Sequence, residues 1–361
     1  MTPDLDPIAV VRRRAAAQRL TGAQYASAAE AVAWSGGVQA QEYAEALWSL
    51  SARVADAPTL ADIEAAGDRG EILRTHVLRP TWHFVAAADL RWLLRLTGPR
   101  VQAKIAGRHR ELGLDPETLA RCNDALVAVL GDGEPRTRRE LGVALAAAGI
   151  DMTGQRLPHT LGNAELAAVI VSGPRRGKQH TYSLIDDRVP AAPERSREAD
   201  VAELVRRYFT SHGPATLRDF AWWSGLTMAD GRAGVAACGE ALVGEEASDG
   251  TLWIAAPSAS DIPGESGSAA LMLGTYDELT VAHRDLRNVY ADGRATNELL
   301  IRPIVVDGIT VGGWTRRLAR REVTIEVRLE APLDGRQTAA LQAAADRFGA
   351  FVGLPAVTVG A

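Results

Sequence analysis

The spacing of apolar residues predicts helices along most of the chain, separated by short alternating segments. Apolar residues three and four apart form one face of a helix, whereas strict alternation is typical of a half-buried strand. The first part is predicted to contain the helices Ile8–Leu20, Ala23–Ser35, Gln41–Ala52 and Thr59–Ala66, the strand pair Ile72–Leu78 and Thr81–Val85, and the helices Arg91–Thr97 and Gly98–Arg110.

This order of elements, helices followed by a hairpin, recurs twice. The second copy is predicted to have the helices Pro116–Leu130, Arg136–Ala148 and Leu157–Val171, and, after the breaks at Gly173-Pro174 and Gly177, the strand Thr181–Ile185. The third is predicted to have the helices Glu198–Ser211 and Met228–Gly239 with a further helix in 213–226, and the strands Leu242–Glu246 and Thr251–Ala255. Helices followed by a hairpin are typical of a winged helix, and tandem repetition is more informative than a single copy.

The pattern changes after residues 256–270, which are rich in Pro, Gly and Ser. Asp307-Gly308 is a strong signal for a tight hairpin. The strands predicted here are Leu271–Leu273, Leu299–Val306, Ile309–Trp314 and Glu322–Leu329, followed by the helix Gly335–Phe348. We therefore expect a mainly helical α+β fold, with three tandem winged-helix motifs at 1–112, 113–195 and 196–257 and a β-rich, half-barrel-like domain at 258–361.

Composition narrows the class of protein. A chain of 361 residues, 47% of them hydrophobic, has ample material for several cores. No run of eighteen apolar residues and no secretory leader is seen, and the only cysteines, Cys122 and Cys238, fit neither a metal spacing nor a disulfide framework. We expect a cytoplasmic protein with no membrane association.

Charge is distributed unevenly. The net charge is −5, which by itself gives no indication of a nucleic-acid partner. The segment from Arg69 to Arg110, however, contains nine basic residues and only two acidic ones, Glu71 and Asp89. A second basic cluster consists of Arg12, Arg13, Arg14 and Arg19. Arginine forks suit bidentate contact with phosphate, although either cluster could equally be a solvated helix face.

The segment Gln39-Ala40-Gln41 follows Gly36-Gly37 and has two interpretations. The two glutamines could be a solvated polar edge of a helix, or a reactive pair. Residues two apart point to one side of an extended segment but diverge on a helix, so the pair converges only near a loop-to-helix junction. The two glycines make such a junction plausible, and a helix N-terminus would also direct amide donors toward phosphate.

Four motifs resemble the bacterial winged-helix DNA glycosylases of the AlkZ and YcaQ type. They are GGVQAQ at 36–41, RPTWHFV at 79–85, YDEL at 276–279 and RPIVVDGITVGGW at 302–314, in the order of that family. The resemblance implies a C-shaped scaffold with a basic channel for duplex DNA. It also implies a monofunctional glycosylase that hydrolyses the N-glycosidic bond of N7-alkylated purines, including bulky natural-product adducts and interstrand crosslinks.

The same resemblance makes Gln39 and Gln41 the catalytic residues, in the Gln-x-Gln branch associated with self-protection in antibiotic producers. Two amides cannot deprotonate water, but an N7-alkylguanine is already cationic and leaves without a general acid. Amides can still hold a water and offer carbonyl dipoles to a developing positive sugar. Such weak assistance would cleave labile lesions and spare neutral purines.

Candidate DNA contacts lie in three segments, each with a structural alternative. His83 could touch DNA or pack with Trp82, the hairpin tip at 175–178 could bind phosphate or be merely solvated, and 283–287 could form a loop facing the lesion. The candidates are Arg79, Thr81, His83, Arg175, Arg176, Lys178, His283, Arg284 and Arg287.

Other polar and aromatic residues are assigned structural roles. Asp277 and Glu278 could serve a different enzyme as catalytic carboxylates, but we interpret them as structural, and Trp222-Trp223 as a core anchor. No metal spacing or phosphate loop is present, so we expect no cofactor. The resemblance implies double-stranded DNA with alkylated purines as the partner, and we expect a monomer. The alternatives are a non-enzymatic winged-helix regulator and a glycosylase-like scaffold without activity.

Overall fold

The structure is a computed structural model that describes residues 6–247, 250–256, 269–284 and 301–360. It divides into two compact units. The first contains residues 1–64, 201–223 and 227–361, and the second contains residues 65–200 and 224–226. The division falls within α4 (Leu60–Asp68) and α10 (Arg197–Ser211).

The first unit begins with three helices, as predicted, but each is shorter than expected. They are α1 (Pro7–Ala17), α2 (Ala28–Ser35) and α3 (Tyr43–Ser51), with the two-residue strand β1 (Val38–Gln39) before α3. Asp6 and Ser27 cap the N-termini of α1 and α2 through their side-chain oxygens. The predicted third helix included Gln41, which was wrong, because the helix starts two residues later at Tyr43.

The third predicted copy of the repeat is also found in this unit. After α10 come α11 (Leu217–Ser224), α12 (Met228–Cys238) and the hairpin of β7 (Leu242–Ala247) and β8 (Gly250–Ala255). A capping box between Thr227 and Asp230 starts α12. A short 3-10 turn, Gly239–Ala241, joins α12 to the hairpin.

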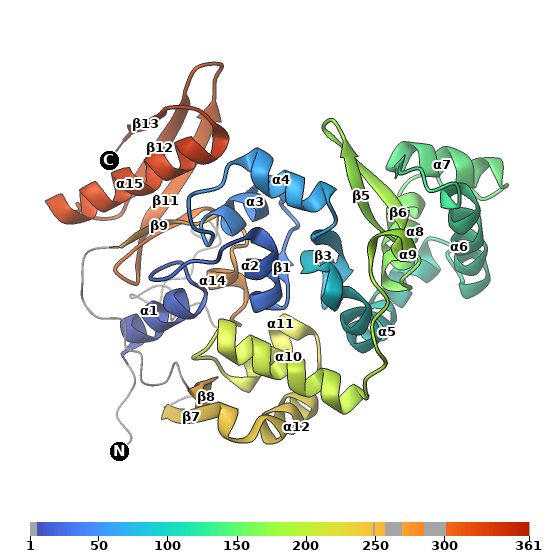
Figure 1. The fold of residues 1–361 in the computed structure, drawn as a ribbon, viewed down its shortest axis with the longest axis horizontal. Helices are drawn as coiled ribbons and strands as arrows, with labels where there is room; N and C mark the ends of the chain where they lie inside the picture. The colour runs from blue at the N-terminus through green and yellow to red at the C-terminus, as the bar shows by residue number, and fades with distance from the viewer. Residues whose placement is uncertain (1–5, 248–249, 257–268, 285–300, 361) are drawn as a thin grey trace. The chain divides into compact units, whose positions relative to one another are not determined.

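The C-terminal part is β-rich, as predicted, and packs a helix against a five-stranded sheet (Figure 1). The strand order is β13-β12-β11-β10-β9. Phe348 of the helix packs edge-on against Trp48 and Trp314, with ring centroids 5.1 and 4.9 Å apart. The elements are β9 (Ala270–Met272), the short helix α14 (Glu278–Val281), β10 (Pro303–Val306), β11 (Ile309–Leu318), β12 (Val323–Leu329), α15 (Gly335–Val352) and β13 (Ala356–Val359), the last of which the sequence did not predict.

The second unit contains two hairpins and the helices around them (Figure 1). Cys122, Leu126, Leu141 and Ile170 are central members of its hydrophobic core. Its elements are β2 (Ile72–Val77), β3 (Arg79–Ala86), α5 (Ala87–Glu111), α6 (Pro116–Leu130), β4 (Arg136–Thr137), α7 (Arg138–Ala147), α8 (Arg156–Leu166), β5 (Ile170–Arg176), β6 (Gln179–Leu184) and α9 (Ile185–Arg188).

Two predicted boundaries in this unit were wrong. The helices expected on either side of Gly98 are a single helix, α5, which continues through Pro99. A Cβ on Gly98 would come within 2.9 Å of the main-chain oxygen of Leu166, so the glycine permits α5 and α8 to pack closely. Helix α8 ends at Leu166, five residues earlier than predicted, because Ile170 and Val171 pair with β6 instead.

Candidate active site

The Gln39-Ala40-Gln41 segment lies between a left-handed turn and the start of a helix. Gly36 ends α2 with a φ of 73°, a conformation that favours glycine. β1 follows, and α3 begins at Tyr43. The motif therefore occupies a loop-to-helix junction, the position at which the sequence analysis expects two such glutamines to converge.

Burial alternates along this segment. Val38 and Ala40 are 2% and 0% exposed, whereas Gln39 is half-buried and Gln41 is exposed. The two glutamines are therefore the more accessible residues of this segment, a pattern typical of alternate side chains in an extended chain. It also explains the small middle residue, since Ala40 is completely enclosed.

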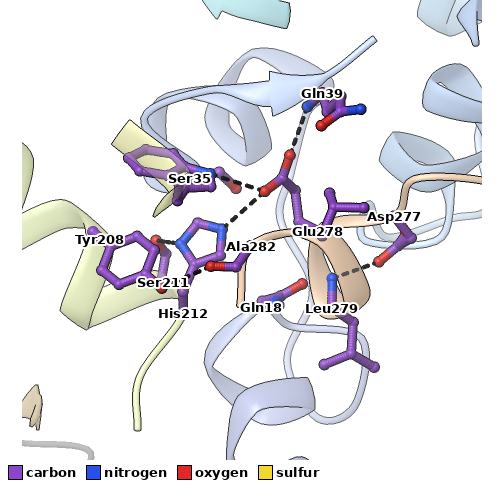
Figure 2. A network of polar contacts seen from close by, with 12 residues as sticks. Gln18, Ser35, Gln39, Tyr208, Ser211, His212, Asp277, Glu278, Leu279 and Ala282 are labelled. Atoms are coloured by element: carbon purple, nitrogen blue, oxygen red, sulfur yellow. Dashed lines mark hydrogen bonds and ion pairs between the residues drawn. The ribbon is translucent and has the colours of Figure 1, made fainter. Parts of the chain in front are cut away.

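The carboxylate of Glu278 holds the backbone of this segment. Its Oε1 accepts a hydrogen bond of 2.6 Å from the main-chain N–H of Gln39, as Figure 2 shows. Its Oε2 accepts one of 3.0 Å from the indole N–H of Trp223 and lies 3.4 Å from Nε2 of His212. Glu278 is 1% exposed, so a buried carboxyl group binds the main chain of the candidate catalytic strand.

The ring of His212 is fixed by its neighbours (Figure 2). Its Nδ1 lies 2.7 Å from Oγ of Ser211, and Tyr208 stacks on it with centroids 5.0 Å apart and planes 13° apart. Tyr208 donates to the main-chain oxygen of Ala282 at 2.8 Å. The histidine is therefore held in one orientation beside Glu278.

Asp277, the neighbour of Glu278, belongs to a different buried network. Arg53 donates to both of its oxygens, at 2.8 and 2.9 Å, and also to Gln18 at 2.6 Å. Ser49 donates to the same carboxylate. These contacts fit the structural role expected for Asp277, whereas Glu278 contacts the candidate site itself.

The three candidates of the first hairpin lie on β3. Arg79 and Thr81 are half-buried, and His83 is completely buried, with Nδ1 3.0 Å from the main-chain oxygen of Thr81. Trp82 packs against His76, with centroids 4.6 Å apart, and not against His83. Burial directs His83 into the core of its hairpin, so it has no exposed surface for DNA.

The tip of the β5–β6 hairpin carries three candidates in different environments. Arg175 is half-buried and bonds Asp68, whose pKa falls because these contacts outweigh the effect of burial. Arg176 is exposed and lies 2.7 Å from Glu140, whose pKa is lowered to about 2 by the main-chain N–H and hydroxyl of Thr137 and by Arg176. Lys178 is exposed at the turn.

The third group of candidates separates. His283 is 1% exposed, with Nε2 3.0 Å from the main-chain oxygen of His212. Arg284 is exposed, and its main-chain N–H donates to Asp219 at 2.7 Å. Arg287 lies outside the described residues. Of the two described residues in this group, Arg284 has a side chain that is accessible to DNA, and His283 does not.

Other residues behave differently from the sequence interpretation. Arg13 and Arg14 of the N-terminal basic cluster are buried: Arg13 bonds Glu245, and Arg14 donates to the main-chain oxygen of Pro214 at 2.8 Å. Trp223 is a core residue as expected, but Trp222 is 52% exposed.

Two features were missed by the sequence analysis. Glu278 was assigned to the scaffold, because nothing in its local sequence shows that it reaches Gln39, 239 residues away. The end of β11 and the turn that follows it expose Arg317, Arg320 and Arg321, together with Leu318. The signal for this turn was present, as four arginines within residues 315–321. Such a cluster suits phosphate contact.

The described ranges contain no group of three or more His, Cys, Asp or Glu side chains placed to hold a metal ion. Cys122 and Cys238 are both free thiols. Among the helices of the described part, none is long and apolar enough to cross a membrane.

Comparison with known proteins agrees with the resemblance inferred from the motifs. A family model described as "DNA glycosylase AlkZ-like" matches residues 32–351. Among solved structures, the DNA glycosylase AlkZ of Streptomyces sahachiroi is similar, with a TM-score of 0.73 and 21% sequence identity over 99% of this chain and 100% of that one. None of the curated proteins matches significantly. The structural likeness shows the fold, and the family model covers most of the chain, so this chain belongs to the AlkZ-like DNA glycosylase family and is a DNA glycosylase.

Proposed function

We propose that this glycosylase is monofunctional and excises N7-alkylated purines from duplex DNA, with Gln39 and Gln41 as its catalytic residues. The observation that carries the proposal is the alternating burial of the Gln39-Ala40-Gln41 segment, which leaves both glutamines more accessible than the alanine between them and supports a convergent pair. Bulky natural-product adducts and interstrand crosslinks are the further substrate classes we expect, because an exposed Gln41 does not require the base to enter a deep pocket.

The chemistry fits an already cationic leaving group. Alkylation at N7 places a positive charge on the purine, and breaking the glycosidic bond neutralises it, so the base needs no proton from the enzyme. The sugar becomes electron-poor as the bond lengthens. Side-chain amide oxygens of Gln39 and Gln41 can orient a water below the anomeric carbon and place negative dipole ends beside the developing charge.

DNA binding is assigned to exposed basic side chains on both units. We propose Arg176, Lys178 and Arg284 as phosphate contacts, with Arg317, Arg320 and Arg321 of the β11–β12 turn as additions. Arg79 and Thr81 remain candidates on β3, and Arg175 would have to give up part of its contact with Asp68. We also propose that the enzyme acts as a monomer.

The test is excision of 7-methylguanine from a duplex by enzyme in excess, followed by cleavage of the abasic site. We expect Gln39→Ala and Gln41→Ala to lower the rate constant by up to about 100-fold, the lower end of the effect of removing one fixed dipole from a site. Gln342→Ala, which removes an exposed glutamine from α15, is the matched control. A rate constant unchanged in both active-site variants would refute the assignment.

The same assay separates the substrate classes. A neutral purine opposite thymine or cytosine should not be released, because two amides provide no proton for an uncharged base. A duplex with a crosslink between two N7 positions should be unhooked at one end. Release of unmodified purine at a comparable rate would argue for a stronger acid or base than the proposed pair.

A further inference from the structure

We propose that Glu278 is a positioning residue, which fixes the catalytic segment by binding the main-chain N–H of Gln39 and is itself oriented by Trp223 and His212. This inference rests on the proposed role of Gln39. It adds a residue that does not touch the substrate and lies 239 positions away in the chain.

The proposed catalytic segment is short and lies close to a turn. β1 is two residues long and is separated from the left-handed Gly36 by one residue, Gly37. The N-cap residue of α3, Glu42, makes no side-chain capping bond. A strong bond to the main chain of Gln39 therefore helps to fix where the two amides point.

The bond from Glu278 is of the strong kind. A hydrogen bond to an ionised carboxylate is shorter and stronger than one between neutral groups, and the separation of 2.6 Å fits this class. The other oxygen is oriented by the indole N–H of Trp223 at 3.0 Å. Trp223 also lies under Gly36, where a Cβ would be 3.6 Å from its ring, so one side chain supports both the turn and the carboxylate.

The imidazole of His212 lies beside the same carboxyl group. Nε2 of His212 lies 3.4 Å from Oε2 of Glu278. This nitrogen makes no well-aligned hydrogen bond among the described residues. Both side chains are buried, and an uncompensated buried carboxylate would be costly. A purely apolar core would not need a carboxyl group at this position. Here one of its oxygens is bound to the main chain of Gln39.

The geometry excludes a direct catalytic role for this carboxylate. Glu278 is 1% exposed and its two oxygens are occupied by donors from Gln39 and Trp223. It acts through the backbone of β1 and not as a general base. Its loss should therefore affect the chemical step more than DNA binding.

Glu278→Gln is the most direct variant, because it keeps the shape but replaces one acceptor by an N–H donor. Either the main-chain N–H of Gln39 or the indole N–H of Trp223 would then meet the new amide N–H and lose its acceptor. In single-turnover excision of 7-methylguanine at saturating enzyme, we expect the rate constant to fall about 10- to 100-fold, as for a small misplacement of catalytic groups. The enzyme concentration at half-saturation should change less than about twofold, because the DNA contacts are retained.

Asp277→Asn is the matched control. It removes a neighbouring, equally buried charge that contacts Arg53 and not Gln39. A purely structural defect lowers the melting temperature and the fraction of active enzyme. With enzyme in excess this raises the enzyme concentration at half-saturation but leaves the rate constant at saturation unchanged. We expect that behaviour for Asp277→Asn and the opposite for Glu278→Gln.

Trp223→Phe is a second variant, should Glu278→Gln fail to fold. It keeps an aromatic ring and removes the donor to Oε2, so the rate constant should fall by a smaller factor. A wild-type rate constant at saturation in whichever variant folds overturns the positioning role. If Gln39→Ala also retains the wild-type rate, the proposed function itself has failed; if only Gln39→Ala loses activity, the positioning inference alone has failed.

Discussion

Gly36 is the residue on which the backbone geometry of the proposed catalytic segment, Gln39-Ala40-Gln41, most directly depends. Its φ of 73° turns the chain out of α2, and the next residues run straight into β1. Only glycine adopts this conformation without a steric penalty from Cβ. The two glutamines are therefore placed by a residue that carries no side chain.

Replacing Gly36 by alanine isolates this conformational effect. The new Cβ would meet Trp223 at 3.6 Å, an ordinary contact, so the cost comes from the backbone and should be about 1–2 kcal/mol of unfolding free energy. Urea unfolding measures it. Gly335→Ala is the control, because Gly335 begins α15, has no positive φ and has open space around it; this substitution should be neutral or stabilising by less than about 1 kcal/mol. Equal destabilisation by both substitutions would refute the argument.

The β5–β6 hairpin shows how an element distributes similar charges between two tasks. Arg175 and Arg176 each bond an acid within the second unit, Asp68 and Glu140 respectively. Lys178 stands at the turn, where the chain reverses through Gly177 with a φ of 62°. The hairpin therefore uses its arginines partly for its own attachment and leaves the lysine exposed.

We expect Lys178→Ala to weaken binding to duplex DNA without affecting stability. One lost phosphate contact should reduce the slope of log affinity against log salt by about one. Titration of labelled duplex at several salt concentrations measures this. Arg336→Ala, which removes the same charge from an exposed position of α15, should leave the slope unchanged. Identical losses in the two variants would show that only net charge matters.

At the scale of the whole molecule, several buried titratable groups make stability depend on pH. Burial, and then the nearby Arg14, hold the pKa of His283 well below its usual range. Burial and the neighbouring His159 do the same for His109. Burial opposes ionisation of Asp219, but the nearby positive charge of Arg14 and the main-chain donors of Thr216 and Arg284 outweigh it and lower the pKa of that carboxyl.

The sign of the pH effect follows from these directions. A histidine with a depressed pKa stays neutral in the folded state but binds a proton when the chain unfolds. The unfolding free energy should therefore fall below about pH 6.5, by at most about 1.4 kcal/mol per pH unit for each such histidine. The Asp219 contribution is lost only in stronger acid, below the ordinary carboxyl range. Urea unfolding across this range, with His283→Gln showing a shallower slope, tests the prediction; equal slopes would contradict it.

Much of the architecture could be predicted from local sequence. The helices and hairpins follow from apolar periodicity and from turn residues such as Asp307-Gly308, which give the pairing of β10 with β11. The motif segments were sufficient to indicate the family. These features depend on residues close together in the chain, whose spacing is itself the physical signal. The four proposed domain limits stay a proposal, as does the assignment to the Gln-x-Gln branch.

Contacts between distant segments were decided only by the tertiary structure. The burial of Arg13 and Arg14, the continuous α5 past Gly98, and the bond from Glu278 to Gln39 each require a partner far along the chain. A glutamate in a local sequence looks the same whether it faces solvent or a catalytic backbone. The sequence by itself determined the family and the candidate catalytic residues, because residue type and local spacing encode both. Their positioning depends on long-range packing, which no local pattern encodes.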